Sequence, residues 1–142
     1  MNAVVKFFQL NFLPRSTDLA LLVLRLWLGL TILLNHGWSK LAGFSQMSAK
    51  FPDPLGVGPA ASLGLAVFAE VVMAALLALG LFTRFAALVL LIELGVAFVR
   101  VHGHALGGPM SGELAFLYLA GFAAILIAGG GKFAVDRSTG AQ

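Results

Sequence analysis

The stretch LALLVLRLWLGLTILLNHGWSKLAGF, residues 19–44, determines how the rest of the chain is interpreted. A helix of about 20 apolar residues crosses the roughly 30 Å of hydrocarbon in a bilayer, and no proline interrupts this stretch. It therefore predicts a membrane-spanning helix. Arg25 lies inside it, where an arginine on an isolated helix costs on the order of 2.5–3.5 kcal/mol. We expect its side chain to face protein or water, where a carboxylate would offset the charge.

The composition excludes a soluble domain. Of the 142 residues, 60% are hydrophobic and 11% are charged, which leaves too little polar surface to cover a water-soluble protein. We expect one polytopic membrane domain over residues 1–142, with the lipid bilayer as its surroundings. The net charge of +3 comes from single Lys and Arg residues without a basic patch, so no nucleic-acid partner is predicted.

Apolar runs separated by glycine- and proline-rich connections predict four spans. The connection at 45–59 contains three prolines, and the connection at 103–112 is rich in glycine. Residues 81–84 follow Gly80 and are too few for anything but a tight antiparallel hairpin. The predicted fold class is therefore all-α, an antiparallel four-helix transmembrane bundle. Its spans are expected at about 19–43, 60–80, 85–102 and 113–129.

The two ends of the chain differ from the spans. Residues 1–16 mix apolar and polar residues over too short a length to cross a bilayer, which predicts an interfacial segment, with a retained signal peptide as the alternative. Residues 130–142 form a polar tail. Four spans place both termini beside the 81–84 turn, on the side that has more Lys and Arg, so the positive-inside rule places both termini in the cytoplasm.

Three charged residues fall at similar depth in the predicted spans. At about 1.5 Å per residue, Arg25 lies roughly 10 Å, Glu93 roughly 13 Å and Glu70 roughly 15 Å from the side that carries the termini. We therefore expect Arg25 to lie between the two carboxylates in the bundle interior. Ionisable groups within a membrane are functional candidates, and the alternative is a buried pin that fixes helix register.

A second polar layer is predicted toward the opposite face. His36 and Lys40 are spaced i, i+4 on one helix face, and Arg100, His102 and Glu113 bracket the glycine-rich connection at that level. Together they predict a vestibule that binds a ligand or relays protons. For Lys40 and Arg100 the alternative is an interfacial anchor whose charged group extends to the lipid headgroups.

No metal site or covalently bound cofactor is predicted. The chain has no cysteine, which excludes disulfides and thiolate ligands. His102 and His104 are two residues apart in a flexible connection, which is a weak pattern for metal ligation. Any redox centre must then belong to a partner.

The assembled motifs resemble the DoxX family of small four-span membrane proteins over residues 20–136. The resemblance implies a four-helix membrane bundle associated with redox metabolism, because one member is the small subunit of a thiosulfate:quinone oxidoreductase and others are linked to membrane complexes that handle thiols and oxidative stress. Where the family often has glycines after the glutamate this chain has Met73 and Ala74, and Glu93 stands where an apolar residue is expected. The motifs are Leu24-Arg25-Leu26 with Gly29, His36-Gly37 before Lys40, Glu70 ten residues before Gly80, residues 80–84 leading into Ala86-Ala87, and His102.

Three functional hypotheses follow. The first is an integral inner-membrane subunit of a quinone-linked oxidoreductase, in which Arg25, Glu70 and Glu93 orient the quinone carbonyls or relay protons. The second is a non-catalytic membrane anchor or assembly module for a soluble oxidoreductase, with the charges as structural pins. The third is a carrier for a small polar or lipid-like solute. The sequence leaves open whether the chain is catalytic and whether it forms a homo-oligomer.

Overall fold

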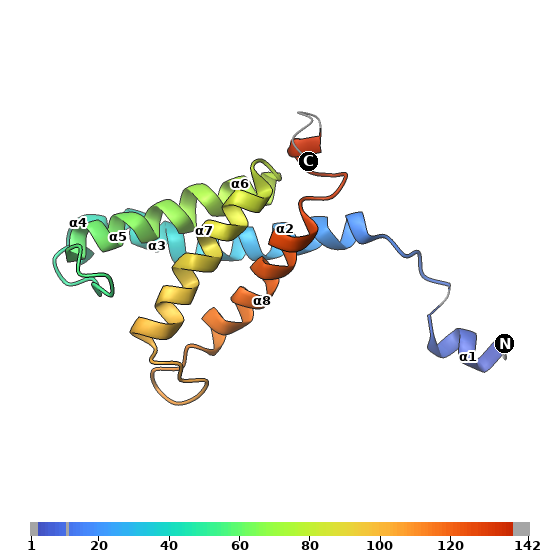
Figure 1. Ribbon diagram of the computed structural model, residues 1–142, viewed down its shortest axis with the longest axis horizontal. Coiled ribbons are helices and arrows are strands. Elements are labelled where there is room, and N and C mark those ends of the chain that lie inside the picture. The colour runs from blue at the N-terminus through green and yellow to red at the C-terminus, as the bar shows by residue number, and fades with distance from the viewer. Residues whose placement is uncertain (1–2, 11, 138–142) are drawn as a thin grey trace.

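The computed structural model describes residues 3–10 and 12–137, and this part of the chain is helical without strands. Residues 1–2, 11 and 138–142, which belong to the predicted N-terminal segment and tail, lie outside the described residues. Four long helical segments lie where the sequence predicts helices (Figure 1). Their bounds are Thr17–Ala42, Pro59–Leu79, residues 83–101 and Glu113–Ala128.

Three of the four segments are not uniform α-helices, because each contains a π-helical stretch. A π-helical turn holds one extra residue, and such turns often occur at functional sites. Sequence periodicity did not predict them. The first segment consists of α2 (Thr17–Ile32), η1 (Leu33–Gly37) and α3 (Trp38–Ala42), the second of α5 (Pro59–Val67), η2 (Phe68–Met73) and α6 (Ala74–Leu79), and the third of α7 (Thr83–Val96) and η3 (Ala97–Val101).

The remaining elements are one long helix and three short ones. The fourth segment is a single α-helix, and α1 lies apart from the helical body in Figure 1. These elements are α8 (Glu113–Ala128), α1 (Ala3–Phe8), α4 (Phe44–Met47) and the 3-10 turn η4 (Val135–Arg137).

Local sequence signals set the helix ends. Ser16 caps α2, since its hydroxyl accepts a hydrogen bond from the backbone N–H of Leu19 at 3.2 Å. Pro59 occupies the first turn of α5, where its missing N–H costs nothing. Gly80 ends α6 with a φ of 74°, a conformation that favours glycine. The tight hairpin predicted between the second and third segments is therefore confirmed.

The core lies along the contacts between α2 and α6 and between α7 and α8. Leu77, Leu90, Phe122 and Ile125 are fully buried there. From the turn at Gly80 the α5–η2–α6 and α7–η3 segments diverge toward their far ends (Figure 1). The molecule therefore has a packed end at the Gly80 turn and a more open end opposite it.

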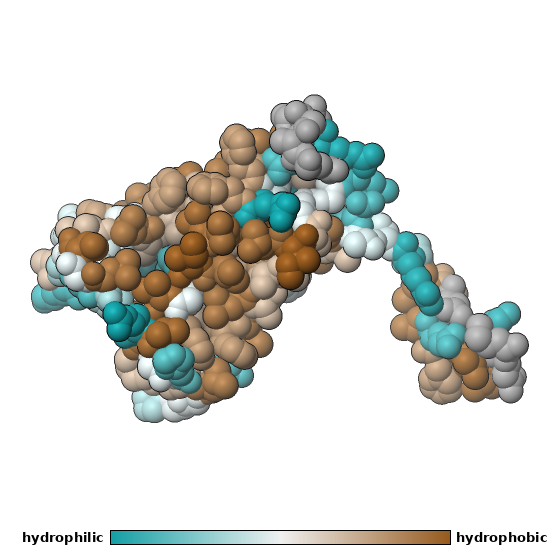
Figure 2. All heavy atoms as spheres, in the orientation of Figure 1, coloured by the Kyte–Doolittle hydropathy of each residue, from teal (hydrophilic) through white to brown (hydrophobic). Residues whose placement is uncertain are grey.

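The outer surface of the helical body is largely apolar. Figure 2 shows hydrophobic residues over most of the visible face, and large side chains such as Trp27 and Ile127 are exposed. Thr17–Ala42 and Pro59–Leu79 are long and apolar enough to cross a bilayer. Helices of this kind are typical of a membrane protein.

Candidate functional site

A cavity of about 680 Å³ lies at the open end of the molecule. All four long helical segments contribute to its wall, and the connection between the first and second segments covers part of it. Most of the wall is apolar. The polar side chains that line it are His36, Lys40, Ser62, Glu70, Glu93, His102, Ser111 and Tyr118.

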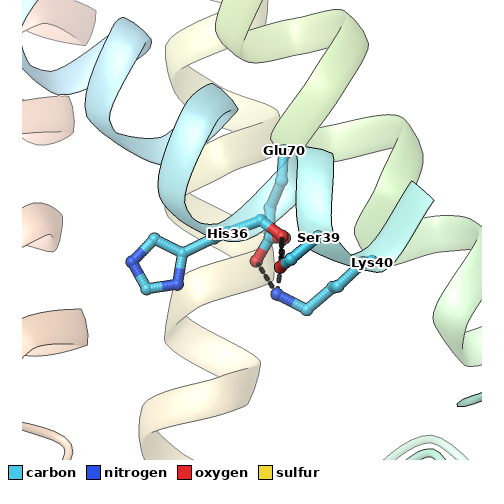
Figure 3. A network of polar contacts seen from close by, with 4 residues as sticks. All are labelled: His36, Ser39, Lys40 and Glu70. Atoms are coloured by element: carbon cyan, nitrogen blue, oxygen red, sulfur yellow. Dashed lines mark hydrogen bonds and ion pairs between the residues drawn. The ribbon is translucent and has the colours of Figure 1, made fainter. Parts of the chain in front are cut away.

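An ion pair between Lys40 and Glu70 forms part of this wall (Figure 3). The Lys40 ammonium lies 2.8 and 2.6 Å from the two carboxylate oxygens of Glu70. The Glu70 side chain is only 4% exposed and that of Lys40 is 18% exposed. Because the carboxylate is almost completely removed from solvent, the lysine is the group that offsets its charge.

The π-helical stretches place these two residues against each other. Gly37 in η1 packs directly on the backbone of Glu70 in η2, so closely that a Cβ at Gly37 would lie 2.5 Å from the Glu70 carbonyl oxygen. Only glycine allows this approach. Lys40 is one turn further along, and helical side chains lean toward the N-terminus of their helix, so its ammonium group reaches back to Glu70.

Two histidines lie on other parts of the wall. In Figure 3 the imidazole of His36 points away from the Lys40–Glu70 pair, and its ring lies edge-on to that of Tyr118 with 6.4 Å between centroids. His102 Nδ1 lies 3.0 Å from the Met110 carbonyl oxygen, which ties the end of η3 to the glycine-rich connection. The His36 ring thus lines the cavity beside Tyr118, whereas the His102 ring contacts the glycine-rich connection.

Glu93 is the second carboxyl group of the cavity. It belongs to α7, and its Oε2 atom is buried with no hydrogen-bond partner among the described residues. Lys40 directs its hydrogen bonds to Glu70. The cavity wall therefore combines one ion pair with one glutamate whose buried oxygen has no hydrogen-bond partner among the described residues.

Comparison with known families identifies the chain. The DoxX family model matches residues 20–103, which is more than half of the chain and includes the ion pair and Glu93. The chain belongs to the DoxX family. No curated protein and no solved structure matches the chain. Its family membership and its apolar helices indicate a membrane protein.

The position predicted for the Arg25 side chain, between Glu70 and Glu93, is wrong. Arg25 is fully buried but does not contact Glu70, which pairs with Lys40 instead. Its Nη1 atom donates to the carbonyl oxygens of Leu77 and Ala78, both at 3.3 Å. The depth estimate followed Cα positions, whereas a long side chain leans about one turn toward the start of its helix. That lean brings the guanidinium group to the Gly80 turn.

Asp136 is the carboxylate near Arg25. Its two oxygens accept hydrogen bonds from the backbone N–H groups of Phe82 at 2.6 Å and Thr83 at 2.8 Å. Burial raises the pKa of Asp136, but the hydrogen bonds from Thr83 and Phe82 and the charge of Arg25 outweigh it, so the pKa lies below its usual value. The carboxylate thus satisfies backbone N–H groups at the N-terminus of α7, where a negative charge is favourable.

The vestibule predicted from the sequence is only partly present. Arg100 and Glu113 are exposed and do not line the cavity, whereas His36, Lys40, Glu70, Glu93 and His102 do. Exposure of Arg100 at the end of η3 fits the interfacial anchor that the sequence offered as the alternative.

Sequence reasoning missed two parts of the site. The first part is Tyr118 and Ser62 in the cavity wall. In the sequence they stand as isolated polar residues in apolar runs, which is the signal that could have drawn attention to them.

The second part is Asp53, which holds the covering connection in place. Its carboxylate accepts hydrogen bonds from Val57 N at 3.0 Å, Gly58 N at 2.8 Å and Ser62 Oγ at 2.7 Å. The hydrogen bond from Ser62 is the main reason that the pKa of Asp53 lies below its usual value.

Proposed function

We propose that this DoxX protein is an integral inner-membrane subunit of a quinone-linked oxidoreductase and that it binds a quinone, or a similar apolar ligand with polar ring substituents, in the cavity. The observation that carries the proposal is the cavity itself. Its volume of about 680 Å³ lies within the roughly 300–1,000 Å³ of small-molecule sites. Such sites combine apolar walls with a few polar groups, as this one does.

The wall supplies the two kinds of contact that a quinone needs. Ala69, Leu94 and Ala115 offer apolar surface for a ring, and Lys40 and Glu93 offer polar groups for its carbonyl oxygens. The chain has no cysteine, and no cluster of three potential metal ligands occurs among the described residues. In this proposal the electrons come from a partner subunit.

The finer fold assignment belongs to the same proposal. We infer an antiparallel four-helix transmembrane bundle with both termini in the cytoplasm. Contacts at the turn end support it, because Lys132 N donates to Asp18 Oδ1 at 2.9 Å and Asp136 N donates to the Gly80 carbonyl oxygen at 2.9 Å. The start of α2, the Gly80 turn and the segment after α8 thus lie together.

Cysteine labelling tests this topology, because the chain is naturally free of cysteine. Ala49→Cys lies in the first connection and Arg137→Cys lies beyond α8, and both positions are exposed. A membrane-impermeant maleimide added to intact cells should label the Ala49→Cys variant and leave the Arg137→Cys variant unlabelled until the cells are opened. The reverse pattern would contradict the proposed orientation.

Quinone binding is tested with a matched pair of variants. Ala97 lines the cavity, whereas Ala120 is exposed on α8 and does not. Purified protein in lipid nanodiscs should bind a photoreactive quinone analogue saturably, with displacement by unlabelled quinone. Ala97→Phe fills the cavity and should abolish this labelling, while Ala120→Phe adds the same side chain elsewhere and should leave it unchanged.

The same preparation separates the alternatives. Wild-type protein that shows no saturable labelling but co-purifies with a soluble oxidoreductase would favour the membrane anchor. Solute uptake by reconstituted vesicles, lost in Ala97→Phe and kept in Ala120→Phe, would favour the carrier.

A further inference from the structure

We propose that the Glu93 carboxyl group is protonated when the cavity is filled and donates a hydrogen bond to a carbonyl oxygen of the ligand. This inference rests on the proposed quinone site and narrows its ligand class. The ligand is a neutral molecule with a carbonyl acceptor, and a cation is excluded. In this proposal the Glu93 carboxyl group selects neutral ligands that carry a carbonyl oxygen over cationic ligands.

The charges of the cavity are the first argument. The charged side chains that line it are Lys40, Glu70 and Glu93, so with both carboxylates ionised and both wall histidines neutral one negative charge stays uncompensated. The other titratable groups of the wall are His36, His102 and Tyr118. Arg25 and Arg100 do not line the cavity and cannot supply the missing positive charge there. A proton on one carboxyl group restores neutrality.

The hydrogen bonds identify which carboxyl group holds the proton. Both oxygens of Glu70 accept from the Lys40 ammonium, which favours the ionised form of Glu70. Glu93 has no such donor for its buried Oε2. An ionised carboxylate without a partner in an apolar wall is far more costly than a neutral carboxyl group. The proton therefore belongs to Glu93.

A protonated Glu93 in turn needs an acceptor. A neutral carboxyl group has one O–H donor, and a buried donor without an acceptor costs about 1–3 kcal/mol. Oε2 is buried out of reach of a cavity ligand and has no hydrogen-bond partner among the described residues, so the O–H group lies on Oε1 of this partly exposed wall residue. A ligand carbonyl in the cavity would accept this bond, and carbonyl oxygens are the polar groups of a quinone.

The experiment measures binding of a short-chain quinone to nanodisc-embedded protein as a function of pH, with three variants. Wild type should bind well at neutral pH and lose affinity at alkaline pH as Glu93 ionises. Glu93→Gln provides a permanently neutral N–H donor, so it should bind at neutral pH and lose the pH dependence. Glu93→Leu has no donor and should bind about tenfold more weakly at neutral pH. Glu113→Gln, an exposed residue outside the cavity, should reproduce the wild-type curve.

The outcomes separate this inference from the function on which it rests. Wild-type protein that binds no quinone at any pH would overturn the proposed function and this inference together. Quinone binding that is independent of pH, or a Glu93→Gln variant as weak as Glu93→Leu, would overturn the inference alone. Binding of tetraphenylphosphonium that strengthens at alkaline pH and disappears in Glu93→Gln would also overturn it, because the ligand would then supply the positive charge.

Discussion

Each end of the helical body holds one cationic side chain, fully buried at the turn end and partly buried at the open end, and the two differ in what surrounds the charge. At the turn end, the Arg25 guanidinium group meets the last carbonyl groups of α6 and packs against Gly80. At the open end, Lys40 meets the Glu70 side chain beside a cavity of about 680 Å³. A charged residue within an apolar run therefore does not by itself indicate a binding site. The space next to the charge distinguishes the structural pin from the candidate site.

Helix direction explains the difference. The C-terminus of a helix carries a partial negative charge and unpaired carbonyl groups, which a guanidinium group can satisfy without a carboxylate. Arg25 leans toward the start of α2, which lies beside the end of α6, and so it finds those carbonyl groups. Lys40 leans the same way from the other end of its segment and finds the π-helical stretch of Glu70. The position of each cation along the first helical segment thus determines which part of the second segment it contacts.

Replacement of Arg25 should have the largest effect on stability. Arg25→Met removes a fully buried side chain that joins α2 to the end of α6, and we expect a loss of about 2–5 kcal/mol in the free energy of unfolding. Unfolding in detergent, followed by circular dichroism, measures the loss. The quinone affinity of the variant that remains folded should stay unchanged, because Arg25 does not line the cavity.

Arg100→Met is the matched control at an exposed position and should change stability by less than about 0.5 kcal/mol. If Arg25→Met kept the stability of the wild type but bound quinone more weakly, Arg25 would belong to the binding site. The contrast between the two ends would then be wrong.

The Lys40–Glu70 pair should have the next largest effect. Lys40→Met leaves the Glu70 carboxylate buried without its cation, and we expect a loss of roughly 3 kcal/mol. The double variant Lys40→Met/Glu70→Leu removes both charges and should recover most of that loss. A double-mutant cycle in detergent measures the coupling. If the stability losses of the two single variants simply added in the double variant, the Lys40 and Glu70 side chains would not stabilise each other.

The close approach of η1 and η2 should contribute less. Gly37→Ala would place a Cβ 2.5 Å from the Glu70 carbonyl oxygen, so the two backbones must separate at a cost of about 1–2 kcal/mol. Because η1 and η2 also form the cavity wall, quinone affinity should fall as well. Gly64→Ala is the control, since nothing lies within 4 Å of its Cβ position and a helical alanine is favoured by about 1 kcal/mol over glycine. If Gly37→Ala and Gly64→Ala lost equal amounts of stability and quinone affinity, the close contact between Gly37 and the Glu70 backbone would not be the cause of the loss.

The helices could be predicted from the sequence, whereas the contacts between them could not. Apolar runs bounded by glycine and proline gave the four helical segments to within a few residues, and Gly80 gave the hairpin. Those signals are local, because helix length and helix ends depend on neighbouring residues. The partner of Arg25 depends on side-chain direction across two segments. Estimates of depth alone therefore paired it with the wrong groups.

The candidate site shows the same limit. The sequence predicts Glu70 and Glu93 in one layer with Arg25, and His36, Lys40 and His102 in a second layer, whereas the structure brings these five residues, without Arg25, to the wall of one cavity. The specific pairing of Lys40 with Glu70 depends on the π-helical stretches, which shift the register in a way that hydrophobic periodicity does not reveal. The role of Asp136 could not be predicted either, because it caps a helix that begins 53 residues earlier in the chain.

The smallest effect should come from the carboxylate that caps α7 at the turn end. Asp136→Asn weakens the hydrogen bonds to Phe82 N and Thr83 N, and we expect a loss of about 1 kcal/mol at neutral pH. Since the pKa of Asp136 is lower in the folded protein than its usual value near 3.9, its contribution is complete above that value and disappears as the pH falls through the lower folded pKa. The difference in stability between wild type and variant should therefore be constant from about pH 5 to 8 and vanish in acid.

Asp53→Asn is the counterpart at the open end, where the carboxylate orders the connection that covers the cavity. It should lower quinone affinity, which Asp136→Asn should leave unchanged, because only the Asp53 network touches the cavity wall through Ser62. If both variants lowered affinity alike, the turn end and the open end would be energetically coupled. The turn end would then act on the ligand site through α7, the helix that Asp136 caps and that carries Glu93.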